Sequence, residues 1–172
     1  MTMPDDVSSP PDALGSRDPA DEECSTPERI RRLLTEQPHA VLCTQSQSQP
    51  YGSLVAFAVS DDLKTLVFST PVTTRKYRLL TECEHVSLLI DSRSASSADM
   101  MGIEAVTVTG HAHVVAVGTE FNRWAGLLTA RHPHLSEFVR AESSALVRVE
   151  VVRYFHVCRF QEVRQWVPGS DL

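Results

Sequence analysis

Six runs of β-type residues follow one another along the chain, separated by turn residues or short helical patterns. Strands joined in this way pair antiparallel. Tyr51–Val59 is almost continuously apolar, which predicts burial on both of its faces, and the polar run Gln45–Pro50 before it predicts a hairpin loop. The runs are Ala40–Thr44, Tyr51–Val59, Lys64–Ser69, Val86–Ile90, Ile103–Val115 and Leu146–Phe160, the last expected as two strands broken near Arg153. The sequence therefore predicts a mainly β fold, an antiparallel barrel of six or seven strands with peripheral helices.

Three or four helical patterns accompany these strands. Ser25 and Glu28 form a capping-box pattern with Pro27 between them, and Pro38 ends the helix that they start. Thr119 is the expected N-cap of a later helix. The apolar stripes are Ile30, Leu33 and Leu34; then Tyr77, Leu80 and Cys83; then Phe121, Trp124, Ala125 and Leu128, followed by Leu135, Phe138 and Val139. Each stripe is expected to pack on the barrel.

The 172 residues suffice for one substantial core, which favours one domain over two. Residues 1–24 contain several prolines, many acidic residues and almost no large apolar side chain, so we expect a disordered leader. Residues 25–172 then form the single domain. The leader has no basic segment followed by an apolar core, which argues against a secretory signal.

The overall charge excludes some classes of partner. A formal net charge of −6 argues against general binding to nucleic acids or anionic membranes. No apolar run approaches the roughly 20 residues needed to span a bilayer. The four cysteines stand singly, without a C-x-x-C pair, so we expect reduced thiols and a cytoplasmic protein.

The strand-to-helix junction in Leu66–Leu80 carries the strongest functional signal. Arg75 and Lys76 open the helix, where the backbone already presents free N–H groups and about half a positive charge. Two cations there are each unfavourable by about 0.3–1 kcal/mol unless an anion binds. The neighbouring hydroxyls belong to Ser69, Thr70 and Thr74. These groups favour a phosphate site without a glycine loop, and the alternative is a solvated basic patch on a surface helix.

The order of this junction and the later segments HVSLLI and VTVTGHA resembles the pyridoxamine 5′-phosphate oxidase-like family of FMN-binding split barrels. The likeness covers about residues 39–115. It implies a split barrel, a bound FMN and a two-fold homodimer with flavin sites at its interface. By this resemblance, the FMN phosphate contacts Ser69, Thr70, Thr74, Arg75 and Lys76, and the flavin ring lies beside Ser53, Leu54 and Val55.

Three departures from the family concern the substrate. Ser53 stands about where pyridoxamine phosphate oxidases carry an arginine, and Ala105 stands where relatives often carry a flavin-contacting glutamine. The C-terminal substrate-binding arginines of those enzymes have no clear counterpart. Arg164 and Trp166 are the nearby candidates, and Trp166 is taken as a candidate cofactor contact. We therefore expect poor turnover of pyridoxamine phosphate.

Metal and nucleophilic chemistry receive little support. His111 and His113 share one face of an expected strand, but a metal site needs three or four ligands, and no other ligand is near in sequence. A solvated or hydrogen-bonded strand face is expected instead. No serine lies in a G-x-S-x-G motif, so no catalytic residue is assigned and any chemistry is expected from a cofactor.

The leading hypothesis is thus a flavin-dependent oxidoreductase that acts on a small molecule, with FMN as the first cofactor and the deazaflavin F420 as the second. The alternative is a protein without turnover that binds a flavin, pyridoxal phosphate or haem. A haem-degrading relative is a further alternative, disfavoured because no added His-rich domain is present. The expected partners are a small-molecule substrate or electron donor and a second copy of the chain.

Overall fold

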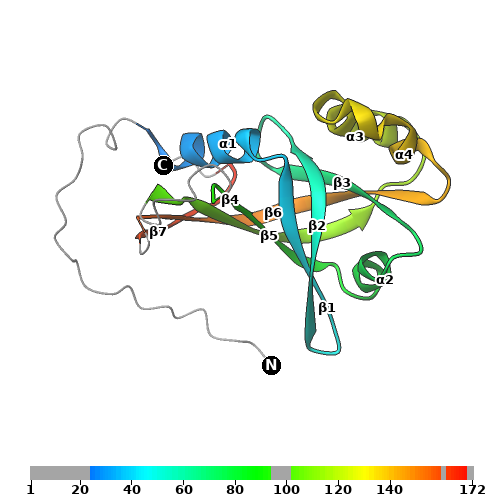
Figure 1. The fold of residues 1–172 in the computed structure, drawn as a ribbon, viewed down its shortest axis with the longest axis horizontal. Helices are drawn as coiled ribbons and strands as arrows, with labels where there is room; N and C mark the ends of the chain where they lie inside the picture. The colour runs from blue at the N-terminus through cyan, green and yellow to red at the C-terminus, as the bar shows by residue number, and fades with distance from the viewer. Residues whose placement is uncertain (1–23, 94–101, 160–161, 170–172) are drawn as a thin grey trace.

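A computed structural model describes residues 24–93, 102–159 and 162–169 of the chain. In this part, seven antiparallel strands lie in the order β3-β2-β1-β4-β5-β6-β7, and β3 also pairs with β6 (Figure 1). That second pairing closes six strands into a barrel, so the predicted antiparallel split barrel is confirmed. The strands are β1 (His39–Ser46), β2 (Gln49–Val59), β3 (Thr65–Pro71), β4 (His85–Asp91), β5 (Ala105–Val114), β6 (Ser144–Cys158) and β7 (Glu162–Trp166).

The helices lie around the barrel as α1 (Thr26–Glu36), α2 (Arg75–Glu82), α3 (Thr119–Arg131), the 3-10 helix η3 (Pro133–Leu135) and α4 (Ser136–Arg140). The predicted capping box starts α1, where the Ser25 backbone N–H donates to the Glu28 carboxylate at 2.8 Å. No helix in the described part of the chain is long and apolar enough to cross a membrane.

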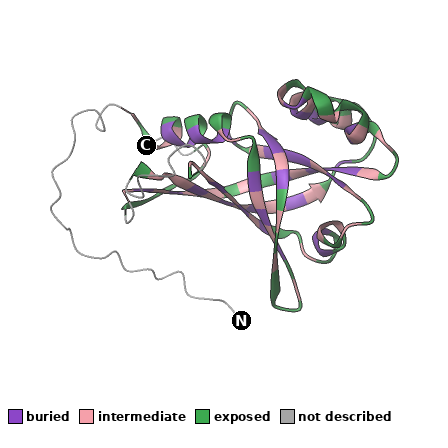
Figure 2. Cartoon of the chain, in the orientation of Figure 1, coloured by how far each residue is buried: buried purple, intermediate pink, exposed green. Residues whose placement is uncertain are grey.

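Two apolar clusters hold these elements together. The first fills the barrel and includes the buried face of α1, which Figure 2 shows turned toward the strands. Its largest fully buried side chains include Tyr154, Phe57 and Phe68. The second cluster lies between α3, α4 and the strands β2, β3 and β6, with Trp124 and Leu128 among its members. The predicted apolar stripes of α1, α3 and α4 therefore pack on the barrel. The predicted stripe of α2 needs a correction, because α2 buries Leu79 and Leu80, whereas Tyr77 and Cys83 are half-buried.

The predicted break near Arg153 is wrong, because β6 is one continuous strand. Arg153 pairs with Thr109 and Val151 with Gly110, so Val152 is an extra residue in a β-bulge. A β-carbon on Gly110 would lie 2.4 Å from a backbone oxygen of β6. Glycine thus allows the two strands to approach closely at the bulge, and pairing continues beyond it.

The β1–β2 hairpin also differs from the expectation. Only Gln47 and Ser48 lie between the strands, with φ of 49° and 66°, so the loop is shorter than the predicted Gln45–Pro50. Burial of β2 on both faces is confirmed only for its second half. The first half belongs to an arm that extends beyond the barrel, where the side chain of Leu54 is 63% exposed (Figure 1).

The start of α3 is a further correction. Gly118 is the N-cap and Thr119 the first helical residue, and the Gly118 carbonyl accepts the first helical hydrogen bond at 3.1 Å. The φ of Gly118 is 155°, a value that disfavours threonine at this position. The predicted leader at residues 1–24, apart from Cys24, lies outside the described residues, as do Phe160 and residues 94–101 of the predicted loop Asp91–Gly102.

Candidate functional site

The predicted phosphate site lies at the start of α2, immediately after β3. Thr74 is the N-cap of α2, and its hydroxyl accepts the Tyr77 backbone N–H at 3.3 Å. Arg75 and Lys76 are the first two helical residues, and the first turn contains no acidic residue. The N–H groups of a first helical turn have no intrahelical acceptor, so this helix start combines free backbone donors with two cationic residues.

The hydroxyl groups of the site shape the turn. Thr74 donates to the Pro71 carbonyl at 2.8 Å, so Thr70, whose oxygen lies 3.0 Å from that of Thr74, donates to Thr74. Ser69 donates to the Ala145 carbonyl on β6 at 3.0 Å. All three hydroxyl hydrogens are thus used within the protein. An anion at this point would meet the cationic side chains and backbone N–H groups rather than these hydroxyls.

Lys76 connects the start of α2 to β2. Its Nζ donates to the Leu54 carbonyl at 3.0 Å, and burial lowers the pKa of the ammonium group. The Ser53 hydroxyl is buried and has no hydrogen-bond partner among the described residues. Val55 is buried in the barrel, whereas Leu54 projects outward. The Lys76 hydrogen bond thus joins the start of α2 to the strand that is predicted to lie beside the flavin ring.

An open hollow of about 550 Å³ is lined by α2 and the turn that precedes it. Its lining contains the guanidinium groups of Arg75 and Arg78, which suit an anionic ligand. The lining residues are Val72, Thr73, Thr74, Arg75, Tyr77, Arg78 and Thr81.

Trp166 lies elsewhere in the single chain. It pairs with Tyr154 on β6, with ring centroids 5.6 Å apart, whereas Ser69 pairs with Leu146. Tyr154 is eight positions after Leu146 on β6, about 26 Å at the usual rise of a strand. Ala105 also pairs at that far end of β6. Of the predicted site residues, Ser69, Thr70, Thr74, Arg75 and Lys76 lie around one turn, and Lys76 links this turn to Leu54 on β2. Trp166 lies apart from them.

The predicted histidine face lies beside a second hollow of about 430 Å³, whose lining includes Cys43, His85 and His111. The His85 and His111 rings meet edge to face at 4.8 Å. Strand pairing brings in a carboxylate that the sequence did not place there, since Glu84 lies 3.6 Å from Nδ1 of His111 and 4.0 Å from Nδ1 of His113. Within the described ranges, no three His, Cys, Asp or Glu residues are arranged to hold a metal ion.

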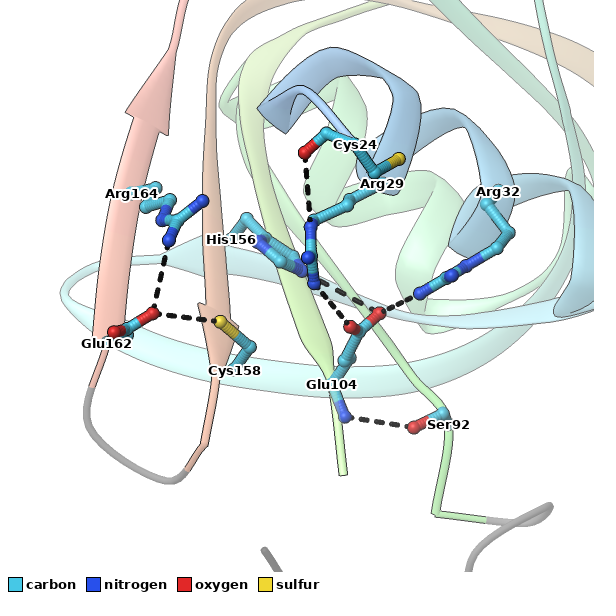
Figure 3. Close-up of polar contacts among 9 residues, drawn as sticks. All are labelled: Cys24, Arg29, Arg32, Ser92, Glu104, His156, Cys158, Glu162 and Arg164. Carbon is cyan, nitrogen blue, oxygen red and sulfur yellow. Dashed lines mark hydrogen bonds and ion pairs between the residues drawn. The ribbon is translucent and has the colours of Figure 1, made fainter. Parts of the chain in front are cut away.

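A buried ionic cluster around Glu104 was missed by the sequence reasoning (Figure 3). The Glu104 carboxylate, 17% exposed, lies 3.4 Å from Arg29 and 2.9 Å from Arg32 on α1. It also lies 3.8 Å from Nε2 of the fully buried His156, which is beyond hydrogen-bond distance, so the arginines make the firmer contacts. His156 and Arg32 lower the pKa of Glu104 to about 2. The sequence signal for this cluster was His156, a polar residue at an inward-facing position of β6.

A family model described as pyridoxamine 5′-phosphate oxidase matches residues 26–158, more than half of the chain. The chain therefore belongs to the pyridoxamine 5′-phosphate oxidase-like family. A search of curated proteins finds no match.

Solved structures share the fold at low sequence identity. A haem-binding protein from Mycobacterium smegmatis matches with a TM-score of 0.76 and 17% identity over 85% of this chain and 59% of its own. ChuZ from Campylobacter jejuni matches with a TM-score of 0.72 and 9% identity over 90% and 62%. A FAD-binding protein from Mesorhizobium loti matches with a TM-score of 0.62 and 14% identity over 77% and 94%. The chain thus spans about three fifths of the first two proteins.

The ionic cluster predicts a pH-dependent stability. The folded pKa of Glu104 lies below the usual 4.5, so its contribution is complete above pH 4.5 and is lost as the pH falls toward 2. Replacing Glu104 by Gln should lower the free energy of unfolding at pH 7 by about 1.5–3 kcal/mol, the usual contribution of a hydrogen bond between charged groups, and the difference from the wild type should shrink in acid. Urea unfolding from pH 7 to 3 measures this. Glu36→Gln, at an exposed position of α1, is the control, and a difference that does not change with pH would contradict the assignment.

Proposed function

We propose that this chain is an FMN-binding flavoprotein that acts as an oxidoreductase on a small molecule. The observation that carries the proposal is the pair Arg75 and Lys76 at the start of a helix without an acidic residue in its first turn. An anion there would remove the electrostatic cost of this arrangement. A flavin supplies the transfer of electrons or hydride, and this chain supplies its binding and orientation.

The residues present fit this cofactor. Arg75 and the free N–H groups at the start of α2 would hold the phosphate. Lys76, which donates to the Leu54 carbonyl, would link this part of the cofactor to β2. The ring would lie beside Leu54, whose exposed side chain offers an apolar contact, and beside the unpartnered Ser53 hydroxyl. Ser53 stands where the resembling oxidases carry an arginine, so we expect a less polar ring site, which suits varied small acceptors better than recognition of one phosphorylated substrate.

The proposal includes a two-fold homodimer. Trp166 and Ala105 lie at the opposite end of β6 from the phosphate site, so one chain cannot place them on the same flavin. A second copy in antiparallel arrangement could supply them. The exposed apolar side chains Leu54, Val114 and Val152 support a covered sheet face.

Haem is the second candidate ligand. The hollow beside β4 and β5 presents two imidazoles, and Glu84 lies near Nδ1 of His111, an arrangement that leaves Nε2 of His111 for an iron ion. The haem-binding neighbour supports this candidate at the level of the fold. F420 and pyridoxal phosphate remain alternatives because each carries a phosphate. An absorbance spectrum of the purified protein separates a flavin from a haem.

A cytoplasmic location is also proposed, on the basis of the isolated cysteines in the sequence. The partners would be a small-molecule substrate and an electron donor.

Reversing the two cations tests the phosphate site. The double variant Arg75→Glu, Lys76→Glu should bind FMN well over tenfold more weakly, because each charge-assisted contact contributes about 1.5–3 kcal/mol. Fluorescence titration measures the affinity. The matched control reverses Arg123 and Arg140, which are exposed cations on α3 and α4, and should leave the affinity unchanged. Equal affinities for both double variants would rule out this phosphate site.

Light scattering tests the dimer. At micromolar concentration with FMN bound, the measured mass should be twice the 19.1 kDa of one chain. Leu54→Asp should weaken both the dimer and FMN binding, because it puts a charge on the strand beside the proposed ring. A flavin-loaded monomer would refute the two-chain site.

An anaerobic assay tests the activity. Bleaching of the bound flavin is followed in parallel with NADH, NADPH and pyridoxamine phosphate as donors. A nicotinamide donor or a reductase should reduce the flavin, and pyridoxamine phosphate should do so poorly. Fast bleaching by pyridoxamine phosphate alone would overturn the substrate assignment, and no bleaching by any donor would leave a protein that binds without turnover.

A further inference from the structure

Arg75 lies against an aromatic ring that comes from another element. Its guanidinium carbon is 4.8 Å from the ring centroid of Tyr51, which lies in the first half of β2, in the arm formed by β1 and β2. Arg75 has no ion pair in the described part of the chain, whereas Arg78, one turn later on α2, lies 3.9 Å from Glu82. The Tyr51 ring is therefore the contact that positions the guanidinium of Arg75.

Stacking is compatible with anion binding. A guanidinium group stacked on a ring uses its flat face, and its N–H donors remain in the plane, where they can bind a phosphate in bidentate fashion. An ion pair with a carboxylate would instead occupy those donors. The Tyr51 contact thus orients Arg75 and keeps its hydrogen-bonding edge available.

Tyr51 is itself held in place. It pairs with Thr44 across the β1–β2 hairpin, and the Thr44 hydroxyl donates to the Tyr51 carbonyl at 3.3 Å. α2 packs against β1 beside this hairpin (Figure 1). A ring on a paired strand lowers the conformational entropy that Arg75 would lose on binding an anion.

We infer that Tyr51 is a positioning residue that fixes the guanidinium of Arg75 for the ligand phosphate, and that it thereby sets the preference for phosphorylated over unphosphorylated flavin. This inference rests on the proposed function. The ring acts through Arg75, so its effect is confined to ligands that carry the phosphate.

The test compares FMN with riboflavin, which lacks the phosphate. Tyr51→Leu should weaken FMN binding by about three- to tenfold and leave riboflavin binding unchanged. Tyr51→Phe keeps the ring and should behave as the wild type. In an Arg75→Gln background, Tyr51→Leu should have no further effect on FMN. Circular dichroism checks that each variant folds.

The outcomes are separable. Equal losses for FMN and riboflavin in Tyr51→Leu, no loss for either, or additive effects of Tyr51→Leu and Arg75→Gln would overturn the role of Tyr51. If the wild type binds neither flavin, the proposed function fails. The same variants are then titrated with inorganic phosphate, and the Arg75 Nε–H signal is followed by NMR. A response that is strong in the wild type and Tyr51→Phe but weak in Tyr51→Leu supports the inference, and any other pattern overturns it.

Discussion

The pairing of β3 with β6 is the constraint on which the rest of the structure depends. It runs from Thr65–Glu150 to Pro71–Ser144, and it closes the barrel. It also fixes where β3 ends, because the Ser69 hydroxyl donates to a β6 carbonyl just before the chain turns. The turn into α2 therefore starts from a rigid point. A phosphate site built on α2 takes its position from the barrel rather than from a loop.

Arg75 and Lys76 lie at the positive end of the α2 dipole, which is electrostatically unfavourable. A carboxylate in the first turn would be the simplest counter-charge, but none is present. Instead, Lys76 donates to a β2 carbonyl, and Arg75 stacks on a β2 ring. Neither contact carries a negative charge, so both cations keep their electrostatic attraction for an anionic ligand. The β1–β2 arm thus keeps the two cations oriented without neutralising them.

The features that the sequence predicted correctly are those that depend on local patterns. The capping box at Ser25 and the junction at Arg75 depend on residues within one or two turns of each other, so they could be recognised directly. The bulge in β6 could not, because it depends on the close approach of Gly110 on another strand. The contact between Arg29 and Glu104 joins residues 75 positions apart. Only the closed barrel brings such pairs together, and a pattern in one segment does not identify the partner residue on another.

The start of α2 and Trp166 lie near opposite ends of β6, and this separation bears on how tightly one chain can bind a flavin. β7 is paired with β6 over its whole length, so Trp166 cannot move toward the phosphate site without breaking strand pairing. If the flavin contacts both ends, each site contains parts of two chains, and only the dimer binds with full affinity. Flavin binding and dimer formation would then be linked by mass action: added FMN would strengthen the dimer, and dilution would weaken FMN binding. A site confined to α2 and β2 of one chain would show no such concentration dependence.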